Sequence, residues 1–179
     1  MKQETKEKVA ASVAGFRLPR YHEIPTVGLY LEQTAKYISE YLAPLGDYGL
    51  TNSMISNYVK KGLVANPVKK QYDRDQIVYL FFIAVAKTVL SLDALTGFIA
   101  LQKRTYSLEV AYDYFCQQFE SLLQFTFELT DAVELSDSDN AIDTEKASGK
   151  RLLYSCIVAV TQKIYLEKSL EAIASEMKE

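Results

Sequence analysis

The chain has 179 residues, 49% of them hydrophobic, which is enough to bury a sizeable core in one domain or two small ones. Only seven glycines and four prolines occur, and apolar residues recur every three to four positions, so we predict an all-α, predominantly helical fold rather than a sandwich or barrel. The net charge of −3 conceals an asymmetry, with +5 on residues 1–105 and −8 on residues 106–179. A basic half suits phosphate binding, although uneven solvated charge explains the asymmetry equally well.

The N-terminus begins with charged residues and lacks the pattern of a secretory signal, so we expect a cytoplasmic protein. The longest apolar run, residues 77–86, is about half of the roughly 20 residues needed to cross a bilayer, so we expect no membrane association. Cys116 and Cys156 are expected to be reduced core residues.

Residues 1–26 are predicted to form an extended basic arm, because Pro19 and Pro25 disfavour a helix and Arg17 and Arg20 add positive charge. Thr26 is a candidate N-cap for an amphipathic helix over 27–43. Pro44 and Gly46 end this helix.

A short helix is predicted over 52–61, capped by Thr51 and ended by Gly62. After a non-helical stretch over 63–72, Asp73 and Gln76 have capping-box spacing at the start of a helix that is apolar nearly all round. Ser91 is a plausible cap for one further short helix. We assign residues 27–105 to one domain.

The second part, 106–179, is predicted to contain a helix over 107–129, an acidic loop over 131–149 and a last helix over 150–177. We expect a dimerisation or effector region. Its aromatic residues favour core packing, and the alternative is an effector pocket lined by Tyr106, Tyr112, Tyr114, Phe115, Phe119, Phe125 and Phe127.

The helix over 52–61 has one polar side. Ile55 and Val59 are four residues apart and pack inward with Tyr58. Asparagine pairs with adenine edges, and serine and lysine reach bases or phosphates. We therefore predict DNA contacts by this side and by the lysines that follow: Asn52, Ser53, Ser56, Asn57, Lys60, Lys61, Lys69 and Lys70. The alternative is the solvated side of a surface helix.

Residues 50–99 resemble the DNA-binding region of MerR-type regulators. The matching positions are Ile55, Tyr58, Gly62 and Leu63 in the recognition helix, Pro67, Lys70 and Tyr72 in the wing, and Ser91, Leu92 and Asp93 after the next helix. The resemblance implies a winged helix-turn-helix, with Tyr72 added to the DNA-binding set, and dimerisation through the helices that follow. Ser56 and Asn57 stand where arginine and tyrosine are common in that family.

A closer resemblance covers residues 17 to about 105, beginning with RLPRYHEIPTVGLYLEQ. This stretch resembles the bacterial family called domain of unknown function 1836. The resemblance implies a shared fold and a regulatory role, and it names neither a ligand nor an operator.

We predict no catalytic residue, metal site or cofactor. The single histidine, His22, lies in the arm, and the sequence contains no CxxC, HExxH, GxGxxG, GxxxxGK[ST] or GxSxG motif. The predicted function is that of a homodimeric transcription regulator that binds double-stranded DNA. The alternative is a helical protein-interaction module that has lost DNA binding.

Overall fold

Helix α4 (Arg74–Ala86) is buried nearly all round and packs on α2, α6 and α7, and the sequence explains its start and its burial. The Asp73 carboxylate accepts a hydrogen bond from the Gln76 backbone N–H at 2.9 Å, and the Gln76 side chain accepts one from the Asp73 N–H at 2.8 Å. This capping box confirms the predicted start. Most residues from Gln76 to Ala86 are buried on all sides of the helix, as predicted. The computed structural model describes residues 1–132 and 144–178.

The part of the chain before α4 contains helices and two short strands. In order these are α1 (Gln3–Ala11), the 3-10 turn η1 (Tyr21–Glu23), β1 (Leu29–Tyr30), α2 (Leu31–Leu42), the 3-10 turn η2 (Ala43–Leu45), α3 (Asn52–Lys60) and β2 (Gln71–Tyr72). The strands pair antiparallel, with Leu29 opposite Tyr72 and Tyr30 opposite Gln71. Helix α2 packs on both α3 and α4. The expectation of a predominantly helical chain is confirmed.

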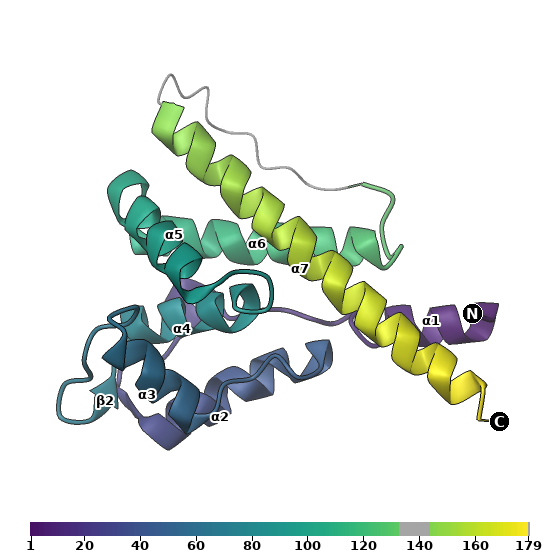
Figure 1. Cartoon of the computed structure of the whole chain (residues 1–179), viewed down its shortest axis with the longest axis horizontal. Coiled ribbons are helices and arrows are strands. Elements are labelled where there is room, and N and C mark those ends of the chain that lie inside the picture. Colours follow the sequence, from purple (N-terminus) through teal and green to yellow (C-terminus); the bar gives the residue numbers. More distant parts are fainter. Residues whose placement is uncertain (133–143, 179) are drawn as a thin grey trace.

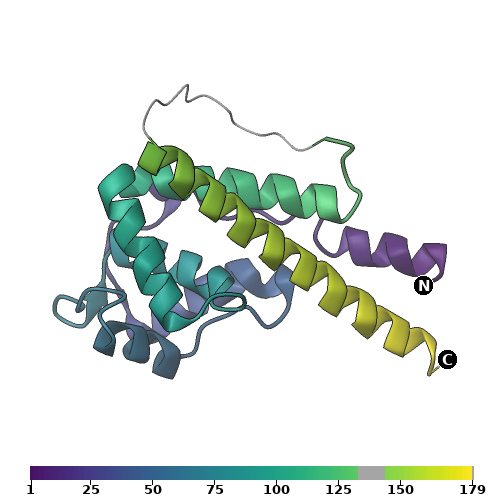
Figure 2. The same ribbon diagram turned by 45° about the horizontal axis from the view of Figure 1, so that its top comes forward.

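Three longer helices follow: α5 (Leu92–Thr105), α6 (Leu108–Thr126) and α7 (Thr144–Glu176). Helix α7 packs on α6, α5 and α4, and its C-terminal half lies beside α1 (Figure 1). The turned view in Figure 2 shows α7 running diagonally across the outside of the molecule, with both termini at the end farthest from α3. The C-terminal end of α7 therefore lies away from α3.

The N-terminal segment differs from the extended arm that we predicted for residues 1–26. Residues 3–11 form α1, because glutamate, lysine, glutamine and alanine favour a helix and Val9 is buried. The later part is pinned to α6, since the Arg20 guanidinium donates two hydrogen bonds of 2.6 Å to the Glu120 carboxylate. The backbone N–H of Leu18 donates to the same carboxylate at 2.8 Å. Tertiary contacts thus order this segment.

Three helix boundaries also differ from the predictions. Helix α2 begins at Leu31, and Thr26 does not cap it, because residues 29–30 are used as a strand. Ser91 caps α5 as predicted, accepting from the Ala94 N–H at 3.2 Å, but α5 is a helix of 14 residues. Residues 144–149, predicted as part of the acidic loop, belong to α7, where Lys146 lies 5.6 Å from the ring centroid of Tyr106. The rest of that loop, 133–143, lies outside the described residues.

One hydrophobic core runs through both predicted regions, from residues of α1 and α2 to residues of α6 and α7. Phe81 of α4 and Phe119 of α6 are among its largest fully buried side chains. Cys116 and Cys156 are free and buried, as expected of core cysteines. Within residues 1–132 and 144–178, no helix has the length and apolar character that a membrane crossing needs.

Candidate nucleic-acid interface

Helix α3 begins and ends at the residues that its sequence predicts. The Thr51 hydroxyl accepts a hydrogen bond from the Met54 N–H at 3.2 Å and so caps the first turn. At the other end, the Gly62 N–H donates to the Val59 carbonyl at 3.0 Å, and the following residue donates to the Tyr58 carbonyl. This Schellman pattern requires the left-handed φ of +76° that Gly62 adopts. The short helix is thus held at both ends by local sequence.

The two sides of α3 are sharply divided. Ile55 is completely buried and Tyr58 nearly so, and burial raises the pKa of the Tyr58 hydroxyl. The opposite side is exposed to solvent, and we call it the polar face of α3. It consists of Asn52, Ser53, Ser56, Asn57, Lys60 and, just after the helix, Lys61. The division follows from the helical spacing of the two apolar anchors.

A tight hairpin follows α3. The Val68 N–H donates to the Gln71 carbonyl at 3.1 Å, and the Gln71 N–H donates back at 2.9 Å, so only Lys69 and Lys70 form the turn. Both lysines adopt positive φ, 50° and 64°, as the central residues of a type I′ turn must. Asparagine and glycine tolerate that conformation, whereas a lysine is strained by it. We call these two lysines the hairpin tip.

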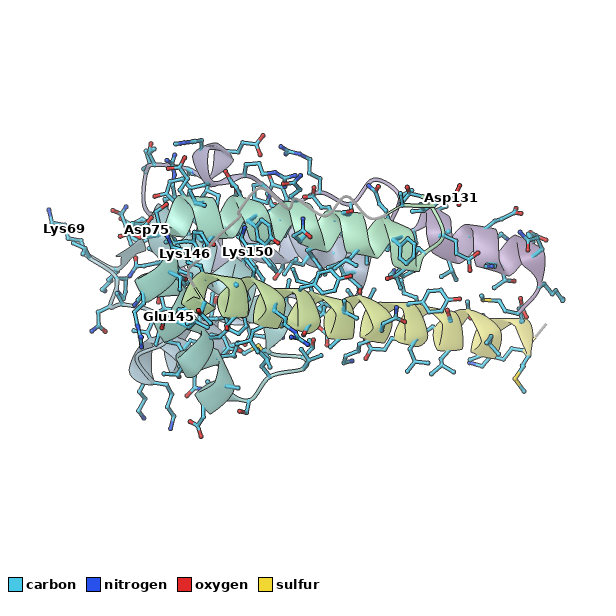
Figure 3. All side chains as sticks on the ribbon, turned by 90° about the horizontal axis from the view of Figure 1, so that it is seen from above. Lys69, Asp75, Asp131, Glu145, Lys146 and Lys150 are labelled. Carbon is cyan, nitrogen blue, oxygen red and sulfur yellow. The ribbon has the colours of Figure 1, made fainter. Side chains whose placement is uncertain are left out.

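Both lysines of the hairpin tip are exposed. In Figure 3, Lys69 extends from the body at one end of the molecule. Lys60 and Lys61 lie at the end of α3 that leads into the hairpin, so the four lysines belong to one continuous stretch of chain at this end (Figure 1). Each remains well solvated, which suits contact with phosphate.

The base of the hairpin is fastened to the core. The Gln76 side chain donates to the Ala65 carbonyl at 2.8 Å, so the capping residue of α4 also holds the start of the hairpin. Gly28 lets β1 approach closely, because a Cβ there would lie 2.8 Å from the Gln71 Cβ. The hairpin is therefore a fixed projection.

Tyr72 is the one predicted DNA-binding residue that is buried instead of exposed. It is only 4% exposed, because its pairing with Leu29 turns the side chain toward the core. Burial also raises the pKa of its hydroxyl. We correct its predicted role to packing under the hairpin. The other eight predicted residues are exposed.

Sequence reasoning missed two features of this region. The first is strand β1, since Leu29 and Tyr30 fit the apolar spacing of the predicted helix and their strand partner lies more than 40 positions away along the chain. The second is the left-handed conformation of Lys69 and Lys70. A two-residue polar step between Val68 and Gln71, flanked by β-compatible residues, is the signal that indicates such a turn.

Outside the candidate interface, the described residues include a cavity that is lined partly by aromatic side chains. Within residues 1–132 and 144–178, no three His, Cys, Asp or Glu side chains gather as a metal site requires. Of the aromatic set, Tyr106 and Tyr114 line a cavity of about 910 Å³ between α5, α6 and α7. Tyr112, Phe115, Phe119 and Phe127 are buried in the core instead. Phe125 is exposed, so the set is divided between the core, a cavity wall and the surface.

The comparison with protein families decides the relationship. The family described as "Domain of unknown function (DUF1836)" matches residues 19–115, more than half of the chain. The chain belongs to the DUF1836 family. The DUF1836 region runs from η1 into the first turns of α6, so it contains α3, the hairpin and α4 but excludes α1 and α7. No curated protein and no solved structure matches the chain.

Proposed function

We propose that the protein is a transcription regulator that binds double-stranded DNA, with the polar face of α3 in the major groove and the hairpin tip on the phosphate backbone. The observation that carries this proposal is the hairpin tip itself. Two lysines occupy the two positions of a turn that disfavours them, beside a helix whose exposed residues are polar except for Met54. Strain of this kind persists where function requires the side chain.

The dimensions of α3 fit this role. An α-helix with its side chains is about 10–12 Å across, and the major groove is about 12 Å wide, so the groove admits a helix such as α3. Asn52 and Asn57 present amides that pair with adenine, whereas Ser53 and Ser56 are short enough for close approach to the bases. Lys60 and Lys61 then reach phosphates at the end of the helix.

Charge favours the same orientation. The +5 half of the chain contains α3 and the hairpin, and the −8 half contains all of α6 and α7. DNA repels the acidic half and attracts the basic one, so the field of the protein steers the α3 end toward the duplex. Together α2, α3 and the hairpin then act as a MerR-like winged helix-turn-helix, and two copies bind a two-fold symmetric site.

The proposal is tested by selecting duplexes from a random library with the full-length protein and measuring their affinity by fluorescence polarisation at several salt concentrations. We expect one enriched sequence and binding that weakens steeply with salt. Asn57→Ala should relax the selected sequence at one position, and Lys60→Ala should weaken all sequences alike. Lys2→Gln, at the far end of the molecule, is the matched control. Enrichment of no sequence, or affinity that ignores salt, refutes the proposal.

One observation favours the alternative, a protein-interaction module. The polar face within α3 contains Lys60 as its only charged residue, and Ser56 and Asn57 replace the arginine and tyrosine common in MerR-type helices. A helix of this composition also suits contact with another protein. A stoichiometric protein partner whose binding is lost in Asn57→Ala, with no DNA sequence enriched, would establish this function instead.

A further inference from the structure

The solvent side of α3 carries two parallel rows of residues. Positions i, i+3 and i+7 lie along one line of a helix, and Met54, Asn57 and Lys61 have this spacing. We call these three residues the methionine row. The second row consists of Ser53, Ser56 and Lys60. Each row ends in a lysine where α3 leads into the hairpin, but only the methionine row begins with an apolar side chain.

Met54 is the large apolar residue of α3 that is exposed to solvent. It is 38% exposed, whereas Ile55 and Tyr58 are buried. The Met54 N–H donates to the Thr51 hydroxyl at 3.2 Å, so this residue lies in the capped first turn of the helix. The recognition helix of a helix-turn-helix contacts base edges with its N-terminal residues. In the proposed complex, Met54 therefore lies beside the bases.

The surroundings of the methionine row suit a nucleic-acid ligand. No aspartate or glutamate occurs in residues 48–72, so no acidic side chain of this stretch repels a phosphate. Within residues 1–132 and 144–178, the side chains of Asn57 and Lys61 have no hydrogen-bond or ion-pair partner. By contrast, Lys36 and Lys163 pair with glutamates one turn away on their own helices. The Asn57 amide and the Lys61 ammonium thus keep their hydrogen-bonding capacity for a ligand.

We propose that the methionine row recognises two adjacent A·T base pairs. The Asn57 amide binds N6 and N7 of the adenine in one pair, and the Met54 side chain packs on the C5-methyl group of the thymine in the next pair. This methyl group is the apolar group that bases present in the major groove, and a flexible thioether chain adapts to its shape. Lys61 lies one turn beyond Asn57 and contacts a phosphate. The inference rests on the proposed DNA-binding function and adds the base sequence that is recognised.

The spacing of the row favours neighbouring base pairs. Three residues rise about 4.5 Å along the axis of α3, whereas neighbouring base pairs are about 3.4 Å apart. The rise from Met54 to Asn57 is therefore closer to one base-pair step than to two steps, which span about 6.8 Å. Guanine presents two acceptors, O6 and N7, that a bidentate arginine or lysine matches best. Neither Met54 nor Asn57 carries such a group, so both positions favour A·T pairs.

Replacement of thymine by deoxyuridine tests the methyl contact on the DNA, where it leaves the fold of the protein unaffected. Duplexes are selected with the full-length protein, and each thymine of the enriched sequence is then replaced in turn. We expect each half of the site to contain two adjacent A·T pairs. Removal of one methyl group from these pairs in one half-site should weaken binding about threefold to fivefold in fluorescence polarisation, which is the effect of one buried methyl group. Replacement of thymines elsewhere should leave the affinity unchanged.

Met54→Ala connects the methyl group to this residue. Alanine maintains the helix and removes the apolar chain, so the variant should bind thymine and deoxyuridine duplexes with nearly equal affinity. The matched control is Met177→Ala near the C-terminus, where the methionine is 83% exposed. This control should keep the full difference between the two duplexes, and circular dichroism confirms that both variants fold. A deoxyuridine effect of unchanged size in Met54→Ala would refute the role of Met54.

The same experiment separates this inference from the proposed function. An enriched sequence without adjacent A·T pairs, or one whose affinity no deoxyuridine changes, overturns the inference and leaves DNA binding established. Enrichment of no sequence overturns the DNA-binding function and the inference together.

Discussion

Replacing the two lysines of the hairpin tip with the residues that a type I′ turn prefers should stabilise the protein and weaken its binding to DNA. The change is Lys69→Asn together with Lys70→Gly. Each lysine has positive φ, 50° and 64°, a conformation that costs about 1–2 kcal/mol for a residue with a side chain. Asparagine tolerates it and glycine adopts it freely. Glycine also raises the conformational entropy of the unfolded chain, which offsets about 0.5–1 kcal/mol of the gain in stability. We expect the free energy of unfolding to rise by about 1–2 kcal/mol.

Two measurements follow the two effects. Thermal unfolding should show a Tm higher by about 2–4 °C for each kcal/mol gained in a chain of this size. Polarisation titrations with a selected duplex should show weaker binding at every salt concentration. The slope of log affinity against log salt should fall in magnitude by about 2, since each lost phosphate contact contributes about 0.9.

The control removes the same charge from the opposite end of the molecule. Lys2→Gln with Lys178→Gln lowers the net charge equally, and both residues lie near the chain termini, far from the hairpin (Figure 1). This control should leave the salt slope nearly unchanged. A lower Tm in the hairpin variant would show that the turn is not strained, and an unchanged slope would show that the hairpin tip does not contact phosphate.

The remaining predictions concern the fold. Gly62→Ala should lower the free energy of unfolding by about 1 kcal/mol, because Gly62 has a φ of +76°. Gly97 lies within α5 with open space around it, so Gly97→Ala should raise the free energy of unfolding by about 0.5–1 kcal/mol. Urea titration measures both changes, and changes of the same sign would contradict the C-cap at Gly62. Burial raises the pKa of the Cys116 thiol to about 12 and that of Cys156 to about 11. At pH 8, iodoacetamide should therefore label the folded protein at least about a hundredfold more slowly than the urea-unfolded protein. Equal labelling rates would refute this prediction. Glu120→Gln should destabilise the protein by about 1–3 kcal/mol and increase hydrogen exchange in residues 17–21, and unchanged exchange there would show that this carboxylate does not hold the segment.

Local sequence predicted the helices whose ends have chemical signals. Thr51 and Gly62 delimit α3, and Asp73 with Gln76 begins α4, because a capping side chain and a left-handed glycine act within a few residues of their own position. The division of α3 into two sides followed from helical spacing for the same reason. The exposure of the eight polar and lysine residues of the candidate interface could therefore be predicted from the sequence.

Features that depend on distant partners were predicted wrongly or missed. Leu29 and Tyr30 form a strand because β2 supplies their hydrogen bonds, and Tyr72 is buried because of the same pairing. The N-terminal segment is ordered by Glu120, about 100 residues away from Arg20, and no local pattern reveals that contact.

By itself, the sequence determined that this chain is helical, where several helices begin and end, and which side of α3 is polar, since each of these depends on interactions within a few residues. Only the tertiary structure decided that a two-residue strand fastens the hairpin and that α1 and η1 replace an extended arm. Backbone pairing and burial depend on which distant segments meet, and that is a property of the folded chain as a whole.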